Sequence, residues 1–213
     1  MTQRKLFYIL PALVAALLLV LAGAAFLARP KSVQPDSRPL EGLGNFGAVP
    51  DFALTERSGA RIALSNLKGK VWLADFIYTA CQDTCPLESA AMAQLQKDLP
   101  SDRLKLVSFS VDPERDTPAV LARYAEVFHA DPARWLFLTG KKSDMHRLVQ
   151  EGFHLSAIPI TEDAAHAAGE IYHDAHFVLI DGAAQIRGYY ESSDSAALKR
   201  LRADAKKLLA ENG

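Results

Sequence analysis

Short apolar runs recur along the chain from about residue 50 onward, and their spacing predicts an alternation of strands and helices. The run VWLADFIY (71–78) is nearly continuous and consists mostly of β-forming residues, which is typical of a strand buried on both faces. The segment PDFALTERSGARIAL (50–64) predicts a hairpin that turns at Ser58 and Gly59. Further strands are expected at LKLVSFSV (104–111) and WLFLT (135–139), and a closing hairpin at HFVLID (176–181) and IRGYY (186–190).

Four helices are expected between and after these strands, most of them starting at a proline or at a residue type that caps helices. They span residues 87–99 after Pro86, 118–128 after Thr117, 143–150 with Ser143 as the cap, and 194–209 at the end of the chain. Strands that alternate with helices and finish in an antiparallel hairpin are typical of an α/β fold. The order of elements matches a thioredoxin-like topology, in which a reactive loop follows the first central strand.

The N-terminal stretch is more hydrophobic than the rest of the chain. From Leu6 to Leu27 it has 22 residues without a charge, roughly 33 Å as a helix and enough to cross a bilayer core. Arg4 and Lys5 precede it, so the positive-inside rule keeps the N-terminus in the cytoplasm and exports the remainder. A cleaved signal peptide is the alternative, but this run is longer than the usual apolar core of such signals. No cysteine lies near its end, which argues against a lipid anchor.

Three segments are therefore expected: a membrane anchor at 1–28, a flexible tether at 29–50 and a folded domain at 51–213. The tether is expected because prolines and glycines are frequent there and large apolar residues are few. A net charge of −1 gives no indication of a nucleic-acid partner. No Arg-rich transit peptide precedes the anchor, which favours a bacterial inner membrane with the folded domain in the periplasm.

Both cysteines of the chain lie in one motif, TACQDTCP, as Cys81 and Cys85. An exported domain meets an oxidising compartment, in which cysteine pairs are used deliberately. The motif follows the carboxyl end of a predicted parallel strand, and Cys85 comes just before Pro86, at a helix start that favours a thiolate. A disulfide that only braces the fold is the alternative, but closing so short a loop removes little chain entropy. The pair is therefore expected to be reactive.

The spacing of the cysteines indicates a metal site at least as well as a redox site. Three residues separate them, whereas thioredoxin-like redox enzymes have two, and soft thiolate ligands indicate Cu(I), zinc or cluster iron. A stable site needs a third ligand, and His173 and His176 flank the start of the last hairpin. Because side chains alternate along an extended chain, these two face opposite sides, and the residues alone do not choose between them. The remaining histidines are weaker candidates: His129, His146, His154 and His166.

Three stretches together resemble the Sco/SenC family of copper-binding, thioredoxin-like proteins involved in cytochrome c oxidase assembly. They are VWLADFIYTACQDTCPLESAAMAQLQ, LVSFSVDPERDTPAVLARYA and HDAHFVLIDGAAQIRGYY, and the resemblance covers roughly Pro50 to Tyr190. It implies that the third copper ligand is His173, six residues before Leu179, and that His176 is a neighbour rather than a ligand. One departure is Gln82, where many family members have proline. It is expected to affect the flexibility and redox potential of the loop without removing a ligand.

The resemblance implies a metallochaperone that delivers copper to the dinuclear copper site of a cytochrome c oxidase subunit. One copper ion per chain, as Cu(I) or Cu(II), is expected on Cys81, Cys85 and His173, with an open side from which the acceptor's thiols can attack. A Cys81–Cys85 disulfide cannot hold the metal, so a thiol reductant must act first. The expected partners are the copper-accepting oxidase subunit, that reductant or an upstream copper donor, and the membrane.

Three other functions are alternatives to copper delivery. A thiol–disulfide reductase acting on the acceptor's cysteines uses the same pair, so the sequence leaves open whether the chain is an enzyme. A copper or redox sensor is not distinguished from a chaperone by sequence. A peroxidase of the peroxiredoxin kind is disfavoured, because the proline before its attacking cysteine is missing and the second cysteine is too close. The charged loop after the second predicted strand is expected to be a turn and helix start first, and a docking surface second: Asp112, Glu114, Arg115 and Asp116.

Overall fold

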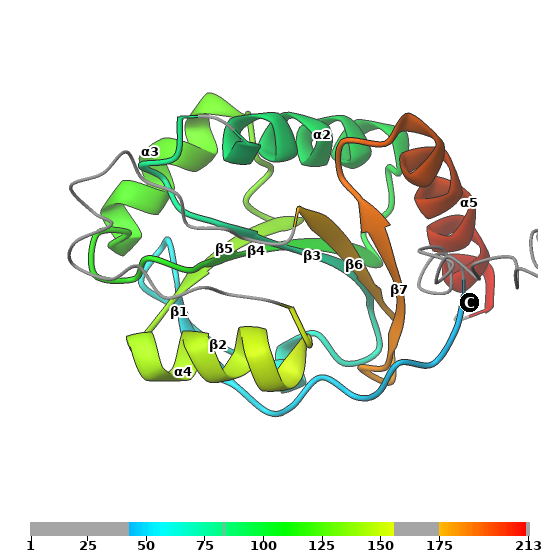
Figure 1. Cartoon of the computed structure of the whole chain (residues 1–213), viewed down its shortest axis with the longest axis horizontal. Coiled ribbons are helices and arrows are strands. Elements are labelled where there is room, and N and C mark those ends of the chain that lie inside the picture. Colours follow the sequence, from blue (N-terminus) through cyan, green and yellow to red (C-terminus); the bar gives the residue numbers. More distant parts are fainter. Residues whose placement is uncertain (1–42, 83, 156–174, 212–213) are drawn as a thin grey trace, which may run out of the picture. The chain divides into compact units, whose positions relative to one another are not determined.

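Seven strands form the centre of the structure, a computed structural model that describes residues 43–82, 84–155 and 175–211 (Figure 1). The strands are β1 (Ala53–Glu56), β2 (Arg61–Ala63), β3 (Val71–Ile77), β4 (Leu104–Ser110), β5 (Trp135–Thr139), β6 (His176–Ile180) and β7 (Ile186–Glu191). The helices are η1 (Leu64–Asn66), α2 (Thr84–Asp98), α3 (Pro118–Val127), α4 (Lys142–Arg147), the π-helical turn η2 (Leu148–Gly152) and α5 (Ser195–Glu211).

The strands belong to one sheet in the order β2-β1-β5-β4-β3-β6-β7. The central strands β3, β4 and β5 run parallel, whereas β1 and β6 run antiparallel to their neighbours β5 and β3. Every predicted strand is present: β3 to β7 begin and end within one residue of the expected positions, and β1 and β2 form the hairpin expected within residues 50–64. The predicted α/β architecture is therefore confirmed.

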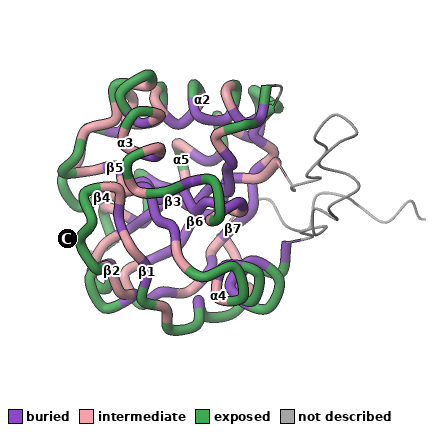
Figure 2. The backbone as a smooth tube through the Cα atoms, turned by 90° about the vertical axis from the view of Figure 1, so that its left-hand side faces the viewer, coloured by how far each residue is buried: buried purple, intermediate pink, exposed green. Residues whose placement is uncertain are grey.

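Alternate residues of β3 face two separate hydrophobic cores. Leu73 and Ile77 pack in the core beneath α2, α3 and α5, and Trp72 and Phe76 pack in the core beneath α4. Figure 1 shows these helices on the two sides of the sheet, and Figure 2 shows the buried strands between exposed outer helix surfaces. A strand buried on both faces must be apolar throughout, which explains the nearly continuous run that marked it in the sequence.

Two helix starts show how the local sequence sets the ends of these elements. Thr117 caps α3 as predicted, and its side chain accepts a hydrogen bond from Val120 N (3.4 Å). Helix α2 begins at Thr84, earlier than predicted, so Pro86 lies third in the helix and Cys85 lies in its first turn. Proline is tolerated there because the N–H groups of a first helical turn have no acceptor within the helix.

The predicted cap at Ser143 is wrong, because Ser143 lies inside α4. The residue at the cap position is Lys141, whose side chain makes no capping hydrogen bond. The helix ends at Arg147, and the chain continues as a π-helical turn to Gly152 rather than as an α-helix to Gln150.

Residues 43–50, expected to end the tether, pack against the folded unit. The backbone N–H groups of Gly44, Phe46 and Val49 donate hydrogen bonds of 2.7–2.9 Å to carbonyls of residues 184–187, and the Val49 side chain is buried. The folded part of the described chain therefore begins before the boundary expected at residue 51. The predicted anchor lies outside the described residues. No helix among those described has both the length and the apolar character needed to span a bilayer.

The core beneath α2 contains two carboxyl groups, those of Asp75 on β3 and Glu88 on α2. Glu88 Oε1 accepts a hydrogen bond from Ser192 Oγ (3.1 Å), while Asp75 has no well-aligned partner among the described residues. Burial raises the pKa of Asp75 to about 7, and the nearby Ser108 hydroxyl offsets only part of that effect. Burial, together with the charge of Asp75, raises the pKa of Glu88 to about 8. The pair therefore retains a proton in the core near neutral pH.

This buried acid predicts a stability that falls as pH rises. The pKa of Asp75 is higher in the folded chain (about 7) than its ordinary value of 3.8. Its contribution to stability is therefore fully present below about pH 4 and is lost as the pH rises to about 7. We expect Asp75→Asn to raise the free energy of unfolding at pH 8 by on the order of 1–4 kcal/mol and to change it little near pH 4. Urea unfolding of the full-length chain at both pH values measures this.

Asp98 provides a control of opposite sign. Its pKa is lowered, mainly by the hydrogen bond from Gln94 Nε2 (2.7 Å) and also by Arg202 (2.6 Å). Its stabilising contribution is present at neutral pH and lost in acid, so Asp98→Asn should reduce stability at pH 8 rather than raise it. A loss of stability at pH 8 for Asp75→Asn as well would show that the Asp75 carboxylate is stabilised in the core by contacts that outweigh desolvation.

Candidate metal centre

The cysteine loop, defined as residues 78–82, connects the carboxyl end of β3 to the first turn of α2. Strand β3 stays paired with β4 up to its last residue, Ile77, so the loop starts from a fixed position. The chain then turns, and the N–H of Cys81 donates a hydrogen bond to Tyr78 O (3.2 Å). Cys81 therefore lies at the exit of this turn, and Cys85 lies on the helix that follows.

Both thiols are reduced, and they differ in exposure. The Cys85 side chain is fully buried, whereas Cys81 retains 9% of its accessible surface. The backbone N–H of Cys85 donates to Cys81 Sγ (3.4 Å), and the hydroxyl of Thr84 lies 3.9 Å from the same sulfur. The structure therefore places the Cys81 sulfur at the amino end of α2, where the helix dipole and free N–H groups stabilise negative charge.

The expectation that the helix start favours a thiolate at Cys85 is wrong. Burial raises the pKa of the Cys85 thiol, an effect that the backbone of Tyr78 reduces and that the neighbouring Cys81 and Glu88 increase. The N–H group at the helix start reaches Cys81 Sγ instead. A metal ion that binds both sulfurs must therefore displace a firmly held proton from Cys85.

The described residues supply two ligands of the predicted copper site but not the third. The predicted ligand His173 lies outside them, as does His166. Within the described ranges no cluster of three or more histidine, cysteine or acidic side chains is arranged to hold a metal ion. Of the weaker candidates, His146 lies in α4, while His129 and His154 each adopt a positive φ, of 52° and 54°.

The position of His176 argues against it as a copper ligand. It is the first residue of β6, in which Phe177 and Leu179 face the core that contains the cysteines. Because side chains alternate along a strand, His176 faces the other side, as Val178 does. Its Nε2 lies 4.0 Å from Glu191 Oε2 on β7. Strand β6 nevertheless starts at the sheet edge where antiparallel β3 ends, which is the edge of the cysteine loop.

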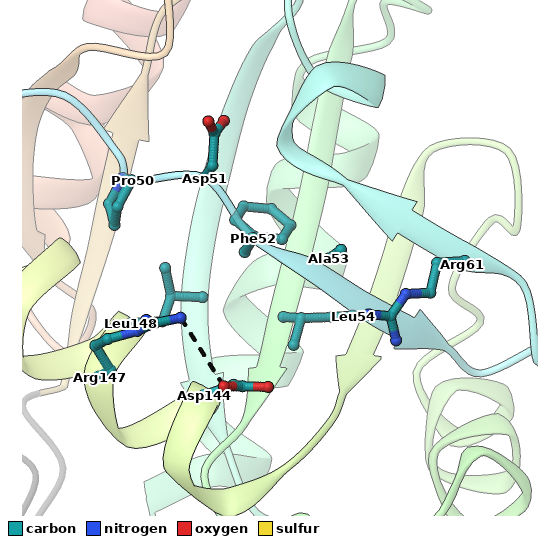
Figure 3. A pocket seen from close by; sticks show the side chains of 9 residues that line it. All are labelled: Pro50, Asp51, Phe52, Ala53, Leu54, Arg61, Asp144, Arg147 and Leu148. Carbon is teal, nitrogen blue, oxygen red and sulfur yellow. Dashed lines mark ion pairs between the residues drawn. The ribbon is translucent and has the colours of Figure 1, made fainter.

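A surface hollow of about 360 Å³ lies elsewhere in the domain (Figure 3). It is lined by Pro50, Asp51, Phe52, Ala53, Leu54, Arg61, Asp144, Arg147 and Leu148. These residues belong to β1, β2, α4 and adjoining segments, and Leu54 and Leu148 pack in the core on the face opposite the cysteines. The hollow contains no thiol or imidazole, and its ion pair joins Arg147 and Asp144 (3.9 Å). It therefore offers no site for a soft metal ion.

The loop after β4 forms the predicted turn and helix start. The backbone N–H groups of Arg115 and Asp116 both donate to Asp112 O (3.1 and 2.9 Å). Glu114 is exposed, whereas Asp112 and Asp116 are buried. The Asp116 carboxylate accepts hydrogen bonds from Thr79 of the cysteine loop. This contact between the two loops was not predicted from the sequence.

The two carboxyl groups of the core beneath α2 were also not predicted from the sequence. Asp75 is the single charged residue within the apolar run 71–78, a signal that a buried strand contains an ionisable group. Glu88 follows Cys85 by three residues and precedes Met92 by four, so helical spacing places it on the buried face of α2. Both signals were present in the sequence.

The unequal exposure of the thiols predicts unequal alkylation rates. In the reduced full-length chain, Cys85→Ser retains the accessible Cys81 and should react with iodoacetamide about tenfold faster at pH 8 than Cys81→Ser, which retains the buried Cys85. Intact-mass measurements over time give both rates, and the same variants unfolded in urea serve as the control, since there the rates should converge. Equal rates in the folded variants would show that α2 opens readily enough to expose Cys85.

Comparisons with known proteins show which family and which solved structures this chain is similar to. The family described as SCO1/SenC matches residues 43–210. The crystal structure of a SCO1/SenC family lipoprotein from Bacillus anthracis str. Ames is 31% identical, with a TM-score of 0.69 over 81% of this chain and 98% of that one. BsSco, described with a disulfide switch and as a member of the Sco family of cytochrome c oxidase assembly proteins, is 29% identical, with a TM-score of 0.68 over 80% and 97% of the two chains. Bradyrhizobium japonicum ScoI with copper bound is 27% identical, with a TM-score of 0.62 over 76% and 99%.

The structural likeness confirms the predicted thioredoxin-like topology of the folded domain. The family match begins at residue 43, where the described part of the chain also begins, and it includes both cysteines and the loop after β4. The match spans more than three quarters of the chain and so covers nearly all of the folded domain. The chain therefore belongs to the SCO1/SenC family.

Proposed function

We propose that this chain binds one copper ion, as Cu(I) or Cu(II), through Cys81, Cys85 and His173, and delivers it to the dinuclear copper site of a cytochrome c oxidase subunit. The observation that carries the proposal is the pair of neighbouring thiols at the carboxyl edge of the sheet, Cys81 in the cysteine loop and Cys85 in the first turn of α2, with no disulfide between them. Thiolates and an imidazole suit copper by their softness. The relatives support the choice of metal and process, since one is described with copper bound and another as an oxidase assembly protein.

The two sulfurs have different tasks in such a transfer. Cys81 is the more accessible, and the N–H at the start of α2 already stabilises charge on its sulfur. A thiol of the acceptor reaches the metal from this side and displaces one ligand at a time, so copper is never released to water. Cys85 is buried and holds its proton firmly, so its ligation depends on proton release and the affinity for copper rises with pH.

The proposed location of the chain is a bacterial inner membrane, with its partners in the periplasm. The charge-free run 6–27 acts as a single membrane span that holds the folded domain in the periplasm of a bacterium. Attachment to a membrane agrees with the description of one relative as a lipoprotein, although this chain has no cysteine near the end of the run. A thiol reductant or an upstream copper donor prepares the site, because the disulfide form cannot bind the metal.

The copper proposal predicts which substitutions abolish binding. Anaerobic titration of the reduced full-length chain with Cu(I), in competition with a chromophoric chelator, should give one copper per chain. Cys81→Ser, Cys85→Ser and His173→Ala should each weaken binding by about 100-fold or more, because each removes a ligand of a three-ligand site. His176→Ala is the matched control and should bind as the unaltered chain does, since His176 faces away from the cysteines. Tight binding by His173→Ala, or its loss in His176→Ala, would assign the third ligand elsewhere.

A thiol–disulfide reductase is the second candidate, favoured by the unequal exposure of the thiols. In that reaction the Cys81 thiolate attacks a partner disulfide, which forms a mixed disulfide and releases one partner thiol. Cys85 then loses its proton and attacks the Cys81 sulfur, which releases the second partner thiol and leaves a Cys81–Cys85 disulfide. A thiol reductant must reverse this oxidation. The disulfide switch named for BsSco agrees with such a redox cycle.

The two candidate functions separate in the His173→Ala variant. Disulfide exchange needs only the cysteines, so we expect His173→Ala to reduce a model disulfide at within about threefold of the unaltered rate while losing tight copper binding. Cys85→Ser should accumulate the mixed disulfide with that substrate in the absence of copper, and Cys81→Ser, its control, should not. If exchange in His173→Ala fell as steeply as copper binding, the histidine would serve both reactions and the two functions could not be separated.

A further inference from the structure

Asp116 is a buried carboxylate whose hydrogen bonds go to the cysteine loop and to β4. Its side chain is 1% exposed. It accepts hydrogen bonds from the Thr79 hydroxyl (2.5 Å) and from the Thr79 backbone N–H (3.2 and 3.3 Å to its two oxygens). It also accepts one from the hydroxyl of Ser110, the last residue of β4 (2.6 Å). One side chain therefore connects the start of the cysteine loop to a central strand.

No cation compensates this carboxylate within the part of the chain that the structure describes. The ion pair of its loop joins Arg115 to Asp112 (3.3 Å) and leaves Asp116 without a basic partner. A buried carboxylate without a cation is costly unless hydrogen bonds satisfy it. Bonds to a charged acceptor are stronger than those between neutral groups, so the Thr79 and Ser110 contacts hold their partners firmly.

Thr79, which is bonded to Asp116, lies in the same turn as Cys81. Thr79 is the second residue of the turn in which the N–H of Cys81 bonds to Tyr78 O (3.2 Å). A turn fixed at this residue fixes the direction in which Cys81 leaves it. The Cys81 sulfur in turn accepts the N–H of Cys85 (3.4 Å). On the other side, Asp116 is held by its own N–H, which donates to Asp112 O (2.9 Å).

We propose that Asp116 is a positioning residue for the cysteine pair, holding Thr79 so that the Cys81 sulfur stays at the start of α2 in the geometry of the reduced, metal-ready site. Its carboxylate touches neither the metal nor the reacting sulfurs and acts through Thr79. This role of Asp116 deepens the proposed function and rests on it only for the Cu(I) affinity measured below. The disulfide equilibrium, measured in glutathione buffers, concerns the cysteines alone.

Two substitutions remove one hydrogen bond each from the same carboxylate and so form a matched pair. Thr79→Val removes the hydroxyl bond on the cysteine loop while keeping the side-chain shape and the backbone N–H bonds. Ser110→Ala removes the hydroxyl bond on β4, a strand that carries no cysteine, together with the bond that Ser110 Oγ accepts from the Asp112 N–H (3.2 Å). If Asp116 serves only to stabilise the fold, the two variants should behave alike in every assay.

The reduced pair is the form in which these contacts are seen, so loosening Thr79 should favour the disulfide. In glutathione buffers, the full-length Thr79→Val chain should form the Cys81–Cys85 disulfide with an equilibrium constant about tenfold larger, ~30 mV for this two-electron couple. Its Cu(I) affinity should fall about tenfold, because the sulfurs are no longer preorganised. Ser110→Ala should change each quantity less than threefold, and Thr79→Ser, which restores the hydroxyl, should behave as the unaltered chain.

Urea unfolding of the same variants separates positioning from folding. Thr79→Val should lose stability on the order of 1–3 kcal/mol and Ser110→Ala at least as much, because each removes one bond to the buried Asp116 carboxyl group and Ser110→Ala also removes the bond from the Asp112 N–H. Equal shifts of the disulfide equilibrium in both variants, or no shift in Thr79→Val, would overturn the proposal. A failure of the unaltered chain to bind copper would instead overturn the proposed function, and the glutathione measurement would still decide the role of Asp116.

Discussion

The parallel pairing of β3 with β4 determines where the chemistry of this domain can lie. All seven residues of β3 are buried, and each has a register partner on β4, from Val71 opposite Leu104 to Ile77 opposite Ser110. Because parallel strands end at the same edge of a sheet, the cysteine loop and the loop after β4 lie side by side there. A one-residue shift of register would move every side chain of β3 into the opposite core and separate Thr79 from Asp116.

The burial that fixes these strands also sets the protonation of the groups beneath the loop. Cys85, Asp75 and Glu88 have almost no contact with water, and the pKa of each is raised because desolvation disfavours its charged form. The resting state of the core beneath α2 therefore contains a neutral thiol and a retained carboxyl proton. Burial also raises the pKa of Asp116, but the hydroxyls of Ser110 and Thr79 donate hydrogen bonds to its carboxyl group and offset part of that effect. The buried carboxyl groups of Asp75 and Asp116 therefore differ in the hydrogen-bond donors that surround them.

The sequence predicted the strands well, because a strand buried on both faces is apolar throughout and a strand buried on one face alternates between apolar and polar residues. Helix ends were harder. Pro86 marks the first turn of α2 but does not say which position in that turn it occupies, and Ser143 is a cap type that the chain places inside a helix. The contact between Asp116 and Thr79 could not be predicted locally, since 37 positions separate the two residues and only the register of β3 and β4 brings them together.

The candidate site could likewise be predicted from the local sequence only in part. Both cysteines follow from one motif, but their unequal burial depends on how α2 packs on the sheet, and the motif alone suggested the wrong sulfur for the stabilising N–H. Alternation along β6 excludes His176 only once it is known which core Phe177 faces. The prediction of His173 came from the family resemblance, and that residue lies outside the described ranges.

Copper binding and disulfide exchange make nearly the same demand on this loop. Each needs two reduced sulfurs near each other, one of them open to a partner and the other shielded from unwanted reaction. Cys81, which retains 9% of its accessible surface, and the fully buried Cys85 satisfy that demand for either chemistry. The difference lies in the number of groups each reaction requires, since a copper site needs a third ligand such as a histidine nitrogen, whereas disulfide exchange requires only the two sulfurs. The arrangement of the two sulfurs therefore suits both proposed functions, and a third ligand from another part of the chain would favour copper binding.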